Sequence, residues 1–441
     1  MGGIENGEAT LGGGRQAASV PVSLVLALFL GTVGFLLSWN PELADAAWPG
    51  TNGKVFFSSD RDGNHELYTM NGDGTGQTKL TSTPGDEYGP SVSANGRWVT
   101  FLYKPTEAEA PGQRIRVELM RINGTDRRAV TGSTTNADFS PTFAPDGTTI
   151  VFSRETNPAA ENGRLWKVGV NGQGAQDLIA VSPFREYDPE YSPDGTKVFY
   201  SQEVPLNERV YSVDANGLNP TAVSPAGRGA SDEPSTSPDG SKVAYSSYRT
   251  PVATATMIEV EELSTGATFE AVPPSGQLIP YGPAYSPDGT AIAFARYDAA
   301  DINAAPKIYR VAASGGPVTA LTGPSTAFES DPYWAPEPTV PTVTVLRQPR
   351  RKTKKKKAFF RFTSTDAVGL DCRLNRGPIA SCPLNARISF PRKRRHPQNR
   401  LYVRPYTVDP TAQALGLEAK VPGPWTSYGW RFAKRVRTSG G

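Results

Sequence analysis

Tyr191-Ser192-Pro193-Asp194-Gly195-Thr196-Lys197-Val198-Phe199-Tyr200 is the stretch that decides the fold of this 441-residue chain. Ser-Pro-Asp-Gly suits the four positions of a type I turn, because proline presets the second position and glycine accepts the fourth. The residues that follow alternate between apolar and polar, as in a half-buried strand. The stretch therefore predicts a turn that leads into a β-strand.

This turn recurs along the chain. The residues of its full copies are Pro145, Asp146, Gly147, Pro193, Asp194, Gly195, Pro238, Asp239, Gly240, Pro287, Asp288 and Gly289. Val92-Ser93-Ala94-Asn95-Gly96 is a degenerate copy, and Tyr333-Trp334-Ala335-Pro336 is a truncated one. A proline precedes every copy, and the spacings between these prolines are 51, 48, 45, 49 and 49 residues. A period of this length indicates a solenoid, a propeller or an array.

The content of one period distinguishes these architectures. The turn is followed by one β-rich run, such as Val198-Phe199-Tyr200, and then by a second, such as Val210-Tyr211-Ser212-Val213. The second run usually ends in a tight pair such as Asn216-Gly217, which suits a type I′ hairpin. A short further run follows, and no helical period appears. Four antiparallel strands per period predict the blade of a β-propeller.

The phase of the repeat predicts how the array closes. It begins at the second strand of a blade, near Lys54, and ends on a lone first strand at 332–336. Together these ends make one blade, so we expect an all-β fold with a six-bladed propeller over residues 47–337. Tyr333-Trp334 should pair beside Val55–Phe57, which would remove exposed edge strands.

A family resemblance rests on the same residues. Pro-x-aromatic-Ser-Pro-Asp-Gly, the strand after it and the run from Ser58 to Tyr68 resemble the WD40-like (PD40) repeat of the TolB propeller family. The resemblance covers about residues 51–337 and lacks the Gly-His and Trp-Asp marks of true WD40 repeats. It implies protein–protein interaction at the cell envelope. TolB carries an α/β domain ahead of its propeller, whereas here the first predicted strand follows soon after Ala46, so membership of the Tol–Pal system is not implied.

Residues 1–46 have the pattern of an export element. Val20 to Leu37 is an 18-residue apolar run, and Ala44-Asp45-Ala46 places small residues at a cleavage-type spacing. A cleaved signal peptide and an uncleaved N-terminal membrane anchor both fit this pattern. Either predicts an extracytoplasmic propeller, which is periplasmic, cell-surface or secreted, with membrane association through residues 20–37 in the second case.

The C-terminal part differs in composition. We expect a proline-rich and then basic linker over 338–357, an Ig-like β-sandwich over 358–434 and a flexible tail over 435–441. Phe-x-Phe-x-Ser, the run from Cys372 to Asn375 and a closing tryptophan resemble the Ig-like modules of exported bacterial proteins. Cys372 and Cys382 are the only cysteines, and an exported chain favours a disulfide between them, with two buried thiols as the alternative.

Charge is divided between the two parts. Residues 47–337 contain 22 basic and 35 acidic residues, whereas 338–441 contain 23 and 4. The basic runs are candidate polyanion contacts: Arg350, Arg351, Lys352, Lys354, Lys355, Lys356, Lys357, Arg392, Lys393, Arg394 and Arg395. No interleaving of aromatic and basic residues indicates base stacking, so we expect an anionic envelope polymer rather than a nucleic acid. The alternative is a solvated linker and loop.

A second group is acidic and precedes the first strand of successive blades. Its members are Asp86, Glu87, Asp138, Asp188, Asp232, Glu233 and Asp331. In a propeller these positions should gather at one mouth of the central channel, where an anionic ring would attract a cation or a basic peptide. The alternative is that each carboxylate only caps its own turn.

Residues for catalysis are scarce. The chain has two histidines, His65 and His396, and neither has the context of a Ser-His-Asp triad or a zinc cluster. A calcium loop at Asp60–Asn64 would need a glutamate where Asn71 stands. We therefore expect no catalytic residue, metal or cofactor, and a non-enzymatic scaffold that binds an envelope protein through its loops or channel mouth. The alternatives are a propeller enzyme that acts on polysaccharides or peptides, and a glycan-binding protein without turnover.

Overall fold

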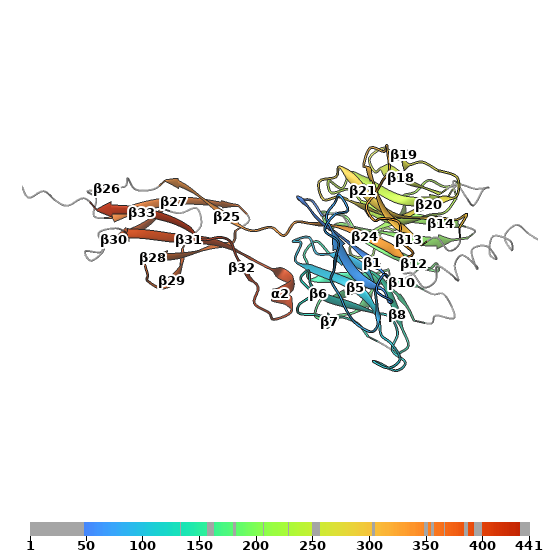
Figure 1. Cartoon of the computed structure of the whole chain (residues 1–441), viewed down its shortest axis with the longest axis horizontal. Coiled ribbons are helices and arrows are strands. Elements are labelled where there is room, and N and C mark those ends of the chain that lie inside the picture. The colour runs from blue at the N-terminus through green and yellow to red at the C-terminus, as the bar shows by residue number, and fades with distance from the viewer. Residues whose placement is uncertain are drawn as a thin grey trace, which may run out of the picture. The chain divides into compact units, whose positions relative to one another are not determined.

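The computed structural model describes residues 48–432 except 133, 157–162, 180–181, 206, 228, 249–255, 302–304, 348–351, 354–356, 366, 383–386 and 392–398 (Figure 1). The predicted export element over 1–46 and the predicted tail over 435–441 lie outside the described residues. Within the described part, no helix has both the length and the apolar character that a membrane span requires.

Six four-stranded antiparallel sheets are present in the described part of the repeat region. The first sheet consists of β24 (Glu329–Pro336), β1 (Asn52–Ser59), β2 (Glu66–Met70) and β3 (Thr78–Lys79). The second consists of β4 (Asp86–Val92), β5 (Trp98–Lys104), β6 (Arg116–Arg121) and β7 (Arg128–Ala129). The third consists of β8 (Ala137–Phe143), β9 (Thr149–Glu155), β10 (Arg164–Gly169) and β11 (Gln176–Asp177). The fourth sheet consists of β12 (Glu186–Tyr191), β13 (Lys197–Val204), β14 (Asn207–Asp214) and β15 (Thr221–Ala222). The fifth consists of β16 (Ser231–Thr236), β17 (Lys242–Tyr248), β18 (Thr256–Glu262) and β19 (Ala267–Val272). The sixth consists of β20 (Leu278–Tyr285), β21 (Ala291–Asp298), β22 (Lys307–Ala312) and β23 (Thr319–Ala320). The predicted all-β repeat of four antiparallel strands is therefore confirmed.

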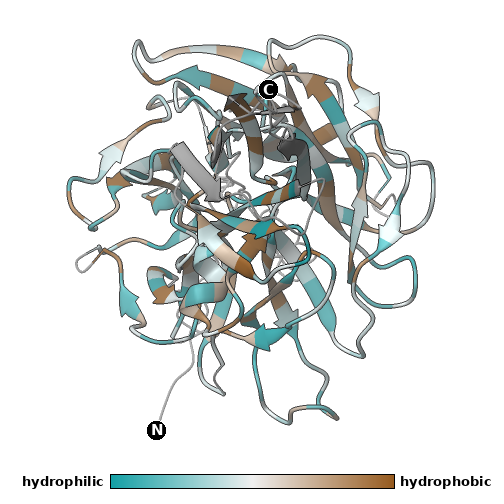
Figure 2. Cartoon of the chain, turned by 90° about the vertical axis from the view of Figure 1, so that its left-hand side faces the viewer, coloured by the Kyte–Doolittle hydropathy of each residue, from teal (hydrophilic) through white to brown (hydrophobic). Residues whose placement is uncertain are grey.

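The sheets follow one another in a closed circle. Each first strand contacts the first strands of the sheets on both sides, in the order β24, β4, β8, β12, β16, β20 and back to β24. The pairing expected between the ends of the array is present, because Val55 lies opposite Trp334 and Phe56 opposite Tyr333. In Figure 2 the strands carry most of the hydrophobic colouring, and many of the peripheral loops are hydrophilic.

The repeated turns have the geometry that their residues favour. The Gly195 N–H donates to Ser192 O at 2.8 Å, and the φ of Gly195 is 71°. Asp194 Oδ1 accepts from Ser192 Oγ at 2.6 Å and from the Thr196 N–H at 3.0 Å. A Cβ on Gly195 would lie 3.1 Å from Pro145 Cγ, so this turn also packs on the proline of the preceding turn, as the turns at Gly240 and Gly289 do. Glycine is therefore needed both for its φ and for this close approach.

The C-terminal part is formed by two sheets around one core. One contains β25 (Thr342–Arg347), β27 (Lys357–Thr365) and β30 (Arg387–Pro391). The other contains β26 (Lys352–Thr353), β33 (Thr426–Phe432), β31 (Asn399–Val408), β28 (Gly369–Leu374) and β29 (Ile379–Cys382), with β32 (Lys420–Pro422) on β31. Side chains of both sheets, including Phe360, Phe362 and Leu401, pack in the core between them. Because β25 pairs with β27, the sheets begin inside the stretch predicted as linker.

The helix α2 (Pro410–Ala414) was not expected from the sequence. Asp409 is its N-cap, and Asp409 Oδ1 accepts from the Thr411 N–H at 3.1 Å and the Ala412 N–H at 3.2 Å. Proline at the first helical position fits, because that position needs no backbone donor.

Candidate functional site

The first strand of every sheet has a bulge at the residue before its proline. The register shifts there in all six strand pairs. The equivalent residues all have positive φ, between 48° and 59°, and are Gly89, Ser140, Asp188, Glu233, Gly282 and Asp331. This conformation is uncommon for residues other than glycine, and bulges of this kind re-aim a side chain. Because the first strands form a closed circle, these six residues form a ring.

Asp188, Glu233 and Asp331 are the acidic members, and we call them the acidic ring. All three side chains are buried. Asp188 Oδ1 accepts from Ser140 Oγ of the neighbouring sheet at 2.8 Å. Glu233 Oε2 accepts from the Gly282 N–H at 2.7 Å, again from a neighbouring sheet. These two carboxylates therefore link adjacent blades as well as lining the ring.

Asp331 is held in a similar way. Its Oδ2 accepts from Ser58 Oγ at 2.8 Å and from Ser330 Oγ at 2.9 Å. Ser58 Oγ also accepts from the Gly89 N–H at 3.3 Å, so this contact extends to the next sheet. The hydroxyl groups of Ser58 and Ser330 and the Gly89 backbone N–H all donate to Asp331, and none of these donors carries a charge that would neutralise the carboxylate.

Burial and mutual repulsion shift the ionisation of the ring. Burial raises the pKa of Asp188 well above its usual range, and the charge of Glu233 raises it further. Burial likewise raises the pKa of Asp331 to about 7, and Glu233 adds to that shift. Asp232, beside Glu233, has its pKa raised by the same two causes. A cation or basic group that entered the ring would favour the ionised carboxylates, so the site is chemically suited to positive ligands.

The remaining acidic residues predicted at the channel mouth lie elsewhere. Asp138 Oδ1 accepts from Arg154 Nε at 2.6 Å, and Asp138 Oδ2 accepts from Arg154 Nη2 at 2.9 Å. Glu87 accepts from Arg127 Nη1 at 2.8 Å. Asp86 is half-buried and accepts from the His65 N–H at 3.2 Å. The structure therefore divides the predicted group into the acidic ring, with the buried Asp232 beside Glu233, and a second set whose members have other partners.

Sequence reasoning missed part of each set. Ser140, Gly89 and Gly282 occupy the ring position without being acidic, and Ser140 supplies a hydrogen bond to the ring. Glu186 and Glu329 occupy the same position in their first strands as Glu87 and Asp138 do. Each of them also lies near an arginine, so they belong to the same set. Counting back from the blade proline would have separated the sets: the ring residue directly precedes it, and the paired acid lies three residues before it.

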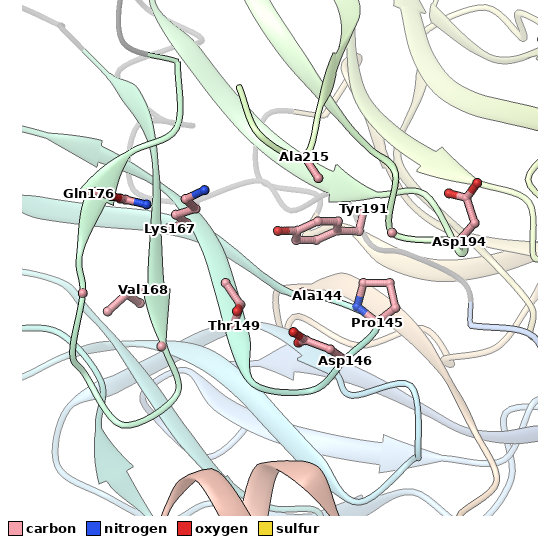
Figure 3. A pocket seen from close by; sticks show the side chains of 13 residues that line it. Ala144, Pro145, Asp146, Thr149, Lys167, Val168, Gln176, Tyr191, Asp194 and Ala215 are labelled. Carbon is pink, nitrogen blue, oxygen red and sulfur yellow. The ribbon is translucent and has the colours of Figure 1, made fainter. Parts of the chain in front are cut away.

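A second candidate is an open cavity of about 510 Å³ between the sheets β8–β11 and β12–β15. Figure 3 shows Tyr191 at its centre, between Lys167 on one side and Pro145 on the other. Asp146, Gln176 and Asp194 also line it. Burial raises the pKa of Tyr191 to about 12, so its phenol stays protonated. Across the described residues, no group of three histidine, cysteine, aspartate or glutamate side chains could hold a metal ion.

The other predicted sites lie in the C-terminal part. Cys372 and Cys382 form the predicted disulfide, which joins β28 to β29 with a Cα–Cα distance of 5.9 Å. Lys352 and Lys357 lie on β26 and β27. The other predicted polyanion contacts, Arg350, Arg351, Lys354–Lys356 and Arg392–Arg395, lie outside the described residues.

The closed circle of four-stranded antiparallel sheets defines a β-propeller protein. Residues 43–186 match the family model described as the TolB beta propeller domain (PD40). The resemblance to the TolB-like propeller family that the sequence indicates is thereby confirmed.

Individual proteins are more distant. An uncharacterized protein of Agrobacterium fabrum is 28% identical over 114 residues, which are 26% of this chain and 33% of that protein. The chain thus matches about a third of the length of this relative. The crystal structure of TolB from Acinetobacter baumannii is similar with a TM-score of 0.51 at 16% identity, over 71% of each chain. Hydrazine synthase of Kuenenia stuttgartiensis reaches a TM-score of 0.50 at 13% identity, over 65% of this chain and 47% of that one. At these identities the likeness concerns the fold alone.

Proposed function

We propose that this protein is an exported, non-enzymatic scaffold of the cell envelope, built from a six-bladed propeller and an Ig-like sandwich. It binds a basic segment of a protein partner at the mouth of its channel. The observation that carries the proposal is the acidic ring of Asp188, Glu233 and Asp331, which are buried together at equivalent bulges. The TolB-like repeat supports a role in protein interaction at the envelope.

Burial of the ring carboxylates is energetically costly. A buried carboxylate loses its hydration, and like charges nearby add to that cost. Here both effects act, since Glu233 contributes to the raised pKa of Asp188 and of Asp331. A lysine or arginine side chain at the ring would offset part of this cost on binding, and binding would strengthen as pH rises through about 7.

Calorimetric titration with a lysine- and arginine-rich peptide tests this proposal. We expect saturable binding to the wild type. In the variant Asp188→Asn/Glu233→Gln/Asp331→Asn the affinity should fall at least tenfold, which is a loss of about 1.4 kcal/mol or more of binding free energy. The control is Glu107→Gln/Asp301→Asn/Glu337→Gln, which removes the same number of charges from exposed positions. Equal affinity of the two variants would reject the ring as the binding site.

The alternatives are an enzyme that acts on polysaccharides or peptides and a glycan-binding protein without turnover. The cavity beside Tyr191 supports both alternative functions, because it is open and lined by polar groups. Incubation of the purified protein with polysaccharide and peptide panels separates the classes. Turnover would replace the scaffold proposal with an enzyme, and saturable glycan binding without turnover would favour the third function.

The export element and the basic runs are further parts of the proposal. Residues 1–46 direct the chain out of the cytoplasm, as a signal peptide or as an anchor. The N-terminal sequence of the protein from cells decides between them: a start after Ala46 indicates cleavage. The basic runs around 350–357 and 392–395 bind an anionic envelope polymer, and elution from a heparin column at low salt would contradict this.

A further inference from the structure

The segment of residues 409–419 packs on the propeller beside the degenerate turn, Ser93-Ala94-Asn95-Gly96. We call it the docking segment. Thr411 Oγ1 donates to Gly147 O at 2.5 Å, and a Cβ on Gly147 would lie 2.9 Å from Thr411 Oγ1 and 3.4 Å from Pro410 Cγ. At the following turns, the glycine approaches the proline of the preceding turn instead, as Gly195 approaches Pro145. The degenerate turn has Ala94 at the proline position, and Pro410 packs on Gly147 there.

The second departure of the degenerate turn is Asn95. The full copies have aspartate at this position: Asp146, Asp194, Asp239 and Asp288. Asn95 Nδ2 donates to Asp409 Oδ1 at 3.3 Å. An aspartate here would place a second carboxylate against Asp409, which is itself buried. The amide therefore replaces a repulsive contact by an attractive one.

The third departure is Trp98, at the start of the second strand. The equivalent residues of four other sheets are half-buried and not aromatic: Thr149, Lys197, Lys242 and Ala291. Trp98 is fully buried, and its Nε1–H donates to Asp409 Oδ2 at 2.8 Å. The Arg121 guanidinium lies 4.5 Å from the Trp98 ring centroid, and Arg121 Nη1 lies 3.8 Å from Asp409 Oδ2. Asp409 thus contacts a hydrogen-bond donor and a cation of the propeller.

The docking segment depends on this contact for its own structure. Its helix has five residues, which is far too short to be stable alone in water. Asp409 Oδ1 caps the helix, while Asp409 Oδ2 binds Trp98. The carboxylate that orders the helix is therefore the one that the propeller recognises, and Ala412 joins the propeller core.

We propose that the degenerate turn, with Trp98 and Arg121, is a built receptor for the docking segment of the same chain, which clamps the C-terminal sandwich to the propeller. All three departures from the repeat, at positions 94, 95 and 98, match features of this one segment. The degeneracy is therefore the specificity determinant that selects one turn of the array.

Hydrogen-exchange mass spectrometry of the full chain tests the clamp. The Ala412 and Gln413 amides, which donate to Asp409, should exchange slowly in the wild type. Asn95→Asp and Trp98→Phe should each speed their exchange about tenfold or more, because the docked state is weakened. The matched controls are Asn216→Asp at an exposed hairpin turn and Trp166→Phe on β10, and both should leave the exchange unchanged.

Amides of β8 and β13 report in the same experiment whether the propeller stays folded. Unchanged exchange of the docking segment in both Asn95→Asp and Trp98→Phe would overturn the proposal, as would equal acceleration in the controls. Protection that rises with protein concentration would also overturn it, because the segment would then dock on a second copy. Concentration-independent protection that both receptor variants abolish would support it.

Discussion

Trp334 lies opposite Val55 in the antiparallel pairing of β24 with β1, which joins the last strand of the repeat array to the first. Both side chains are buried in one apolar cluster with Phe57 and Met70. The neighbouring Tyr333 donates its hydroxyl hydrogen to Val92 O in the next sheet at 2.9 Å. The closing strand is therefore held by its own sheet and by the sheet beside it.

Tyr333 tests how much this closure contributes to stability. We expect Tyr333→Ala to lower the free energy of unfolding by about 3–5 kcal/mol, because a fully buried aromatic ring is lost. Tyr333→Phe should cost about 1 kcal/mol or less, since Val92 O still accepts from Trp48 Nε1 at 2.7 Å. Urea denaturation followed by circular dichroism measures both. Equal losses would mean that the hydroxyl, not the packing, holds the strand.

Asp138 and Asp188 should respond in opposite directions to the same change. Asp138→Asn weakens a buried pair of hydrogen bonds with Arg154, and we expect a loss of about 2–4 kcal/mol. Burial raises the pKa of Asp188 because its ionised form is costly inside the protein, so replacing this carboxyl by the neutral amide in Asp188→Asn should leave stability unchanged or raise it. Thermal unfolding at pH 8 compares the two. Equal destabilisation would show that Asp188 is also a structural partner.

The raised pKa of Asp331 gives stability a specific pH dependence. The usual pKa is 3.8, and burial raises it to about 7 in the folded protein. The folded state thus retains a proton that the unfolded chain releases, so the contribution of this carboxyl is full below about pH 4 and is lost as pH rises to about 7. We expect Asp331→Asn to remove a decline on the order of 2 kcal/mol between pH 5 and pH 8. Urea midpoints at four pH values measure it.

The control for this slope is Asp239→Asn. Hydrogen bonds from Ser237 and from the Ser241 N–H lower the pKa of Asp239 to about 2, so its contribution changes only in acid. In Asp239→Asn the free energy of unfolding should therefore change with pH between pH 5 and pH 8 as it does in the wild type. An unchanged slope in Asp331→Asn would show that Asp331 does not titrate in this range.

The repeat made most of the propeller predictable, and the reason is local. Each turn such as Ser192-Pro193-Asp194-Gly195 is specified by four adjacent residues, and the hairpins by pairs such as Asn216-Gly217. The start of the sandwich was harder to predict from the sequence, because Thr342–Arg347 forms a strand through its pairing with β27, which lies further along the chain. The helix α2 was not visible at all, since five residues show no helical period and their order depends on contacts with Trp98.

The candidate site was partly predictable for a similar reason. The sequence shows acids before each blade proline, but neighbouring positions on a strand point to different surroundings. Whether an acid pairs with an arginine depends on residues of another strand, as Glu87 depends on Arg127. The burial that raises the pKa of Asp188 comes from adjacent sheets, which no local pattern encodes.

Gly217 tests the packing between blades at the hairpin turns. Its φ is 85°, and a Cβ there would lie 1.8 Å from Leu178 O, a backbone atom of the residue that follows β11 of the neighbouring blade. Gly266 occupies the corresponding turn of the next sheet with φ 68° and no atom within 4 Å of an added Cβ. We expect Gly266→Ala to cost about 1–2 kcal/mol from φ alone and Gly217→Ala to cost several kcal/mol more. Equal shifts of the melting temperature would contradict the close approach.

The disulfide between Cys372 and Cys382 should stabilise the sandwich alone. Its small loop contributes about 2.5–3 kcal/mol in the chain-entropy model, and both cysteines pack in the sandwich core. Scanning calorimetry of Cys372→Ala/Cys382→Ala should therefore show a lower transition for the sandwich. The propeller contains no cysteine, so its transition serves as the internal control.

Reductant separates the bond from the packing of the two side chains. Added to the wild type, it should lower the sandwich transition as the double variant does, while the double variant itself should not respond. Alkylation shows whether reductant has freed both thiols. If it has and the transition temperature of the wild-type sandwich is unchanged, the bond adds nothing to stability. A propeller transition that moved with that of the sandwich would contradict the expectation that the bond stabilises the sandwich alone, because the two parts would then unfold together.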